Sequence, residues 1–197
     1  MSTFDEILAT QPLILFSPAG SPLKLCLCVG PDKQSLVVEP YRYGDTSQYW
    51  FVDSLDSSGN IALWSGNGKR VLNVGGDGAL TVQAKSLDGE LSYDTNERLN
   101  VAEVTPGDGA AKTALGWAIA GALIPLVFGL NAAGSLPPTV TLGAPYAIRP
   151  CFDFDRNFNI LGDGPWQAGC AVAAWDGWGG GNPNELWWFG LPSETGS

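Results

Sequence analysis

Carboxylate side chains that could act as acids or bases gather in the last quarter of the chain. Asp153, Asp163, Asp176 and Glu185 all lie there, and a facing pair of carboxylates is the machinery of a glycosidase. The chain contains no histidine, which is the commonest general base and the usual partner of a serine or cysteine nucleophile. Carboxylates on turns are ordinary surface features. We therefore expect no enzymatic activity and no catalytic residues.

Five of the eight tryptophans fall in the same region: Trp166, Trp175, Trp178, Trp187 and Trp188. A flat ring beside polar groups can form a ligand site, because the ring offers an apolar surface and the polar groups offer directed hydrogen bonds. Large aromatic residues are more often core, but Trp178 lies in a glycine-rich loop that cannot bury much. Trp175 or Trp178 is therefore expected to face a ligand.

The segment 153–159 alternates oxygen-bearing side chains, as a calcium-binding loop does. Phe158 stands where such a loop has its glycine, and Gly164 stands where it has its bidentate glutamate. A strand edge with a turn is the better interpretation, so we expect no metal site and no cofactor.

Charge argues against a nucleic-acid partner. Twenty acidic and ten basic residues give a formal net charge of −10, and such a surface repels phosphate backbones and anionic lipid headgroups. The apolar run 113–133 is long enough to span a bilayer. It is interrupted by Gly116, Gly121 and Pro125 and lacks a flanking basic cluster. We favour buried strands or an apolar insertion, with membrane contact as the less favoured alternative.

The first ten residues, MSTFDEILAT, contain two acids and no base, and no apolar region of signal-peptide length follows them. We expect a cytoplasmic protein, with non-classical release as the route by which it would leave the cell. Cys26, Cys28, Cys151 and Cys170 are then interpreted as reduced thiols. A bridge between Cys151 and Cys170 is the alternative for an exported protein.

Aromatic motifs recur along the chain and must be positioned by repeated elements. Gln48-Tyr49-Trp50, Leu115-Gly116-Trp117 and Glu185-Leu186-Trp187 end in tryptophans that are 67 and 70 residues apart (117 − 50 and 187 − 117). Between them recur three short strand patterns, Cys26–Val29, Val71–Val74 and Cys151–Phe154. With 26 glycines and 14 prolines as turn residues, the pattern predicts an all-β protein of three equivalent units.

These landmarks resemble the Gln-x-Trp repeat of the ricin B-chain lectin family. The resemblance implies a β-trefoil, a single domain over 1–197 with lobes at roughly 11–57, 58–120 and 121–191 and irregular insertions within 85–142. It also implies that Trp50, Trp117 and Trp187 are core residues on which the three lobes close. Only Gln48-Tyr49-Trp50 follows the motif strictly.

The same resemblance implies a sugar site in the C-terminal lobe. Asp153 would accept hydrogen bonds from hydroxyls, Trp175 or Trp178 would stack on the ring, and Asn184 would complete the contacts. Glu185 replaces the usual glutamine there. The first lobe offers Cys28 and Glu39 at the acid and ring positions. The second offers Asn73, no ring, and Ala114 before its motif. One competent site of galactose or N-acetylgalactosamine type is therefore expected.

The partners implied are glycans or glycoproteins, with a homodimer or larger homo-oligomer expected because one weak sugar site needs avidity. Two other functions stay open from the residues. One is a β-trefoil that binds protein, as a protease inhibitor or adaptor. The other is a membrane-active toxin that uses the segment 113–133.

Overall fold

Short strands form nearly all of the regular structure. The computed structural model describes residues 4–20, 24–66, 69–86, 91–104, 142, 144–176 and 182–193. The strands are β1 Ile14–Ser17, β2 Leu25–Val29, β3 Leu36–Pro40, β4 Trp50–Ser54, β5 Asn60–Ser65, β6 Arg70–Val74, β7 Leu80–Ala84, β8 Leu99–Glu103, β9 Pro145–Pro150, β10 Arg156–Ile160, β11 Val172–Asp176 and β12 Trp187–Gly190. A single α-helix, α1 (Phe4–Leu8), precedes them in this part of the chain. The all-β prediction is confirmed.

Six of these strands close into a barrel. Antiparallel pairing runs from β1 through β12, β9, β8 and β5 to β4. Leu13 and Trp50 then exchange backbone hydrogen bonds of 2.7 and 2.9 Å, which join β4 back to β1. Closure leaves no open edge on this ring.

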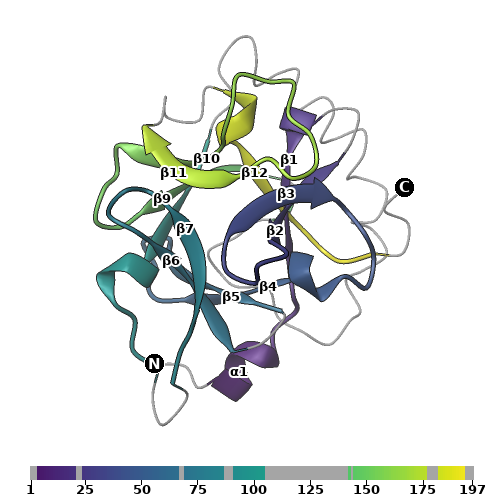
Figure 1. Cartoon of the computed structure of the whole chain (residues 1–197). Coiled ribbons are helices and arrows are strands. Elements are labelled where there is room, and N and C mark those ends of the chain that lie inside the picture. Colours follow the sequence, from purple (N-terminus) through teal and green to yellow (C-terminus); the bar gives the residue numbers. More distant parts are fainter. Residues whose placement is uncertain are drawn as a thin grey trace.

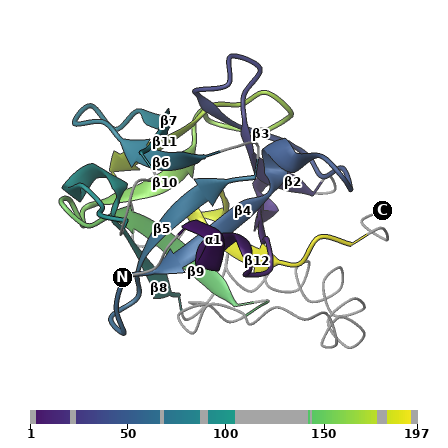
Figure 2. The same cartoon turned by 90° about the horizontal axis from the view of Figure 1, so that it is seen from below.

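The other six strands form three hairpins, β2–β3, β6–β7 and β10–β11, which meet over one end of the barrel. Figure 1 shows the hairpins around the centre of the view, and Figure 2 shows β3, β7 and β11 above β8, β9 and β12. Backbone hydrogen bonds join each hairpin to the next. The donors and acceptors are Val38 N to Cys170 O at 2.9 Å, Val82 N to Gln34 O at 2.8 Å and Ala174 N to Gly78 O at 2.8 Å.

This threefold arrangement confirms the β-trefoil prediction. Its lobes are the strands β1–β4, β5–β8 and β9–β12 in chain order. Gly78 shows how closely the hairpins approach. Its φ is +87°, and a Cβ there would lie 2.2 Å from the carbonyl oxygen of Ala174, so only glycine fits.

A one-turn 3-10 helix precedes the last barrel strand of every lobe: η2 Thr46–Gln48, η3 Thr95–Glu97 and η4 Pro183–Glu185. A fourth, η1 (Pro18–Gly20), follows β1. Two residues after the buried Gln48 and Glu185 come Trp50 and Trp187, both fully buried, as the sequence analysis placed them.

The second lobe departs from the sequence prediction. Its turn ends in Glu97, and the fully buried residue two positions later is Leu99. Leu99 therefore holds the position that we assigned to Trp117, which lies outside the described residues together with the run 113–133. The even spacing of the tryptophans does not reveal Glu97-Arg98-Leu99, because a leucine fills the same apolar space there. No helix in the described ranges is long and apolar enough to cross a membrane.

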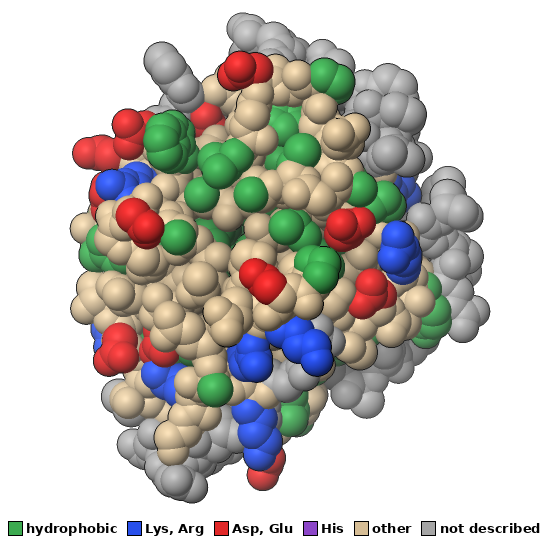
Figure 3. Space-filling view, viewed as in Figure 1, with side chains coloured by type: hydrophobic (Ala, Val, Ile, Leu, Met, Phe, Trp, Pro, Cys, Tyr) green, Lys and Arg blue, Asp and Glu red, His purple; other side chains and the backbone are tan. Residues whose placement is uncertain are grey.

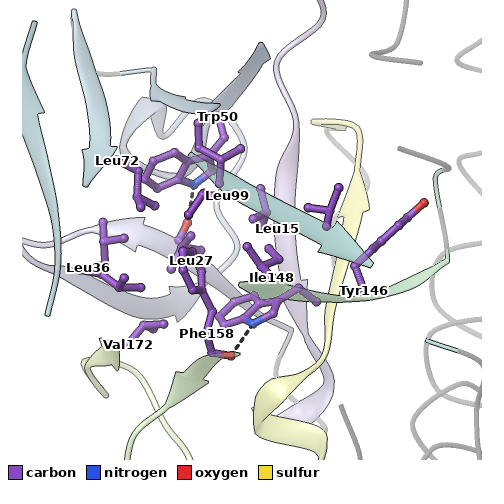
Figure 4. Packing of buried hydrophobic residues seen from close by; sticks show 14 of the residues in the cluster. Leu15, Leu27, Leu36, Trp50, Leu72, Leu99, Tyr146, Ile148, Phe158 and Val172 are labelled. Atoms are coloured by element: carbon purple, nitrogen blue, oxygen red, sulfur yellow. Dashed lines mark hydrogen bonds between the residues drawn. The ribbon is translucent and has the colours of Figure 1, made fainter. Parts of the chain in front are cut away.

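The core joins the barrel to the hairpins, as Figure 4 shows. The indole N–H of Trp50 on β4 donates to the carbonyl of Leu27 on β2 at 3.1 Å. The indole N–H of Trp187 on β12 donates to the carbonyl of Phe158 on β10 at 2.9 Å. Each buried ring contributes roughly 2–3 kcal/mol through its apolar area.

All four cysteines are free thiols, so the alternative bridge between Cys151 and Cys170 is absent from the structure. Cys26 and Cys28 are buried on β2. Burial is the main cause that raises the pKa of both thiols, and hydrogen bonding to Ser47 partly offsets it at Cys28.

Replacing Trp50 by alanine should lower the free energy of unfolding by about 3–5 kcal/mol, because it leaves a cavity and deprives the Leu27 carbonyl of its donor. Urea denaturation followed by circular dichroism measures this. The matched control is Trp175→Ala, an exposed tryptophan whose loss should change stability by less than about 0.5 kcal/mol. Equal midpoints for the two variants would contradict the assignment of Trp50 to the core.

Native protein at pH 8 should react with a thiol reagent at Cys151 and Cys170 long before it does so at Cys26 and Cys28, with labelling sites identified by mass spectrometry.

The raised pKa of Cys26 also predicts that the free energy of unfolding declines above about pH 9. There the unfolded thiol releases its proton while the folded one retains it. Cys26→Ala should flatten that decline. An unchanged slope would show that this thiol does not cause it.

Candidate functional site

The strand register shows which residues of the three hairpins are equivalent. Cys28 pairs with Val37, Asn73 with Thr81, and Asn159 with Ala173. Two pairs further along each hairpin, and so on the same face, Cys26 pairs with Glu39, Val71 with Gln83, and Asn157 with Trp175. Cross-strand partners share one face of a hairpin. Each lobe therefore presents two rows of side chains, one cross-strand pair to a row, at equivalent positions on its hairpin.

The register corrects the sequence assignment of Asp153. We took Cys151–Phe154 as the third strand, but this segment is the turn between β9 and β10. In that turn Asp153 accepts the backbone N–H of Asp155 at 3.2 Å and pairs with the guanidinium of Arg156 at 3.1 Å. Asp153 therefore stabilises the turn, and the strand position expected for it belongs to Asn159.

A sequence signal for Asn159 was present. Arg156-Asn157-Phe158-Asn159-Ile160 matches Arg70-Val71-Leu72-Asn73-Val74, with arginine first and asparagine between two apolar residues. The apolar alternation of Cys151–Phe154 imitates the same pattern a few residues earlier. Phe152 and Phe154 are 38% and 55% exposed, however, and do not enter the core.

Trp175 lies near the end of β11, where the sequence analysis placed a stacking ring. Its side chain is 58% exposed, although a tryptophan buries a large apolar area when it is core. The equivalent positions in the other lobes hold Glu39 and Gln83. Among the described residues at this position, the third lobe therefore has the only aromatic ring.

Asn184, in η4, contacts the strand position beside that ring. Its amide nitrogen donates to Asn159 Oδ1 at 3.2 Å and to the carbonyl of Ile160 at 3.1 Å. Asn159 in turn donates to the backbone carbonyl of Trp175 at 3.3 Å. The structure thus brings together Trp175, Asn159 and Asn184. In the first lobe, Cys28 Sγ and Ser47 Oγ, 3.1 Å apart, hold the corresponding positions.

Glu185 lies beneath this group and does not face outward. It is 1% exposed, and its carboxylate accepts from Asn157 Nδ2 at 3.2 Å and from Asn182 Nδ2 at 3.0 Å. Gln48 occupies the same place in the first lobe, where it accepts from the backbone of Arg42. Glu185 is therefore a supporting residue, which corrects its assignment as a sugar contact. Trp178 lies outside the described residues.

No cluster of three potential metal ligands occurs in the described parts of the chain. The arrangement at the third lobe provides an exposed aromatic surface beside neutral amides. Such a surface can bind the apolar face of a small polar molecule and accept or donate hydrogen bonds at its edge.

Replacing Glu185 by alanine should lower the free energy of unfolding by roughly 1–3 kcal/mol, because the buried amide of Asn157 loses its acceptor. Thermal or urea unfolding would measure the loss, and Asp176→Ala, an exposed acid on β11, is the control. A variant as stable as the control would show that Glu185 does not support the hairpin.

No family model matches the sequence, and no curated protein matches it. The structure is similar to a ricin B-like lectin of Macrolepiota procera in complex with lactose, at 14% identity, with a TM-score of 0.58 and 98% of this chain covering 99% of that one.

Two further structures share the architecture. The C-terminal half of an earthworm R-type lectin in complex with GalNAc is 12% identical, with a TM-score of 0.52 and coverage of 92% of this chain and 98% of that one. The designed threefold-symmetric protein ThreeFoil is 15% identical, with a TM-score of 0.52 and coverage of 92% and 97%. The chain therefore has the ricin B-like β-trefoil fold.

Proposed function

We propose that this protein is a non-catalytic lectin with one sugar site, in the third lobe, formed by Trp175, Asn159 and Asn184. The observation that carries the proposal is the exposed side chain of Trp175, whose backbone carbonyl accepts a hydrogen bond from Asn159, which is itself bonded to Asn184. The ring would stack on the apolar face of a pyranose while the amides contact its hydroxyls. The ligand class is galactose or N-acetylgalactosamine.

The solved structures of similar fold support the sugar class. The Macrolepiota lectin is in complex with lactose and the earthworm lectin half with GalNAc. The first two lobes lack an aromatic ring at the equivalent position, which supports a single site. One site of this kind binds weakly, so we propose that the protein acts as a homo-oligomer, in which several sites engage together.

The absence of catalysis is also part of the proposal. Among the carboxylates that could serve a glycosidase, Asp153 is paired with Arg156 and Glu185 is buried against two amides. Neither presents a free carboxylate to a ligand at the third lobe.

A protein-binding role is the second candidate. The β9–β10 turn exposes Phe152 and Phe154, and exposed aromatic side chains are enriched at protein interfaces. Binding of a protein partner that is lost in a Phe152→Ser, Phe154→Ser variant and retained in Trp175→Ala would favour this role over the lectin.

Lactose, galactose and N-acetylgalactosamine should give saturable binding to the wild-type chain by calorimetry, at millimolar or tighter affinity. Trp175→Ala should weaken that binding at least about tenfold, which corresponds to ~1.4 kcal/mol. Gln83→Ala is the matched control at the equivalent position of the second lobe and should bind as the wild type does.

Two results would contradict the proposal. Equal weakening by Gln83→Ala would move the site away from the third lobe. Absence of binding for all three sugars up to roughly tens of millimolar, beyond ordinary weak single-site affinities, would argue against a galactose-type lectin.

A further inference from the structure

Three hydrogen-bonded side chains connect the barrel to the third-lobe site. Arg149, on β9, donates its guanidinium Nε–H to Asn157 Oδ1 at 2.8 Å, and Asn157 donates its amide nitrogen to Glu185 at 3.2 Å. Asn157 and Glu185 are each 1% exposed, while Arg149 is half-buried. Asn157 is also the cross-strand partner of Trp175. A cation on the barrel is therefore linked through one amide to a buried carboxylate in η4.

The other two lobes are apolar at the same place. Cys26 and Val71 are the residues equivalent to Asn157, and both are fully buried. Their partners on the barrel strands are aromatic, because Phe16 pairs with Cys26 and Trp64 pairs with Val71. The third lobe has exchanged this apolar contact for a hydrogen bond from an arginine.

The exchange accompanies a change at the end of the 3-10 turn. The first lobe has the neutral Gln48 there, whereas the second and third lobes have the buried Glu97 and Glu185. In the second lobe Lys85 forms an ion pair with Glu97. A carboxylate that is removed from water needs hydrogen bonds and a compensating positive charge. In the third lobe, Asn157 and the guanidinium bonded to it contribute both.

Charges on the surface have a smaller effect than a charge in the interior. Figure 3 shows acidic and basic side chains scattered over the face where the hairpins meet, and water and salt screen interactions between such groups. The carboxylate of Glu185 is not in contact with solvent, so the charges and hydrogen bonds around it act more strongly. Loss of the positive charge near it would therefore be felt by the whole of η4.

We propose that Arg149 is a positioning residue of the third-lobe site and is required because position 185 carries a glutamate. The inference rests on the proposed lectin function. Glu185 directly follows Asn184, whose amide donates to Asn159 at 3.2 Å. Without the arginine, the carboxylate is stabilised by moving toward water, and η4 moves with it. The contact between Asn184 and Asn159 is then lost, and the sugar site with it.

The test compares two variants with the wild type by calorimetry on the full chain, with galactose and N-acetylgalactosamine as ligands. Arg149→Met keeps an apolar stem but removes the charge and the Nε–H donor, and it should weaken binding about tenfold. Adding Glu185→Gln should restore the affinity to within about threefold of the wild type, because the loss that remains is one hydrogen bond to a neutral amide. Circular dichroism at the titration temperature shows whether each variant is folded.

The second lobe supplies a matched control, Lys85→Met, which removes the cation beside the equivalent glutamate. It should lower the urea midpoint and leave sugar affinity unchanged. The same pattern in Arg149→Met would mean that the arginine serves stability alone, and would overturn the inference while the lectin proposal stands. A double variant that binds no better than Arg149→Met would also overturn it.

The double variant decides the question if Arg149→Met does not fold. It should fold and bind sugar, since neither charge remains, and a double variant that is unfolded or does not bind would contradict the role given to Arg149. A wild-type chain that binds neither sugar would overturn the lectin proposal and the positioning role together.

Discussion

The indole N–H of Trp50 and that of Trp187 must find acceptors inside a closed core, and the backbone carbonyls of Leu27 and Phe158 provide them. Each bond joins a barrel strand to the first strand of a hairpin. It therefore fixes the hairpin relative to the 3-10 turn that precedes the barrel strand. In the third lobe, this fixes the position of Asn159 on β10 relative to Asn184 in η4. The hydrogen bond between the amides of Asn159 and Asn184 therefore depends on the buried bond from Trp187 to the carbonyl of Phe158, in which neither amide takes part.

The second lobe shows what the fold tolerates. Leu99 occupies the position of the two tryptophans and its side chain has no N–H to donate, yet the β5–β8 strands form the same hairpin and barrel pairing. Leu99 is fully buried, so apolar burial alone fills this position in the second lobe. The polar positions vary more freely. The same backbone places hold Cys28 with Ser47 in one lobe and Asn159 with Asn184 in another.

Local pattern predicted the fold and part of the site. Gln48-x-Trp50 and Glu185-x-Trp187 were identified because a turn followed by a buried aromatic residue leaves a clear trace in sequence. The roles expected for Trp175 and Asn184 come from the resemblance to the Gln-x-Trp repeat, which implies a stacking ring and an amide ahead of the second of these motifs. Asp153 was misassigned because two similar alternating segments lie within ten residues, and only the pairing with β11 decides between them. Glu97-Arg98-Leu99 was missed because its anchor is an ordinary leucine. The burial of Glu185 depends on Asn157 and Asn182, which no local pattern could assign to it.

The three hairpins are joined by hydrogen bonds between backbone atoms: Val38 to Cys170, Val82 to Gln34 and Ala174 to Gly78. Because peptide groups make this junction, the side chains on the outward rows can change without weakening it, provided that Gly78 is kept. Selection, or an engineer, can therefore alter one lobe independently of the others. The chain contains three scaffolds of one geometry, and the side chains on the outward rows, rather than the fold, distinguish one lobe from another.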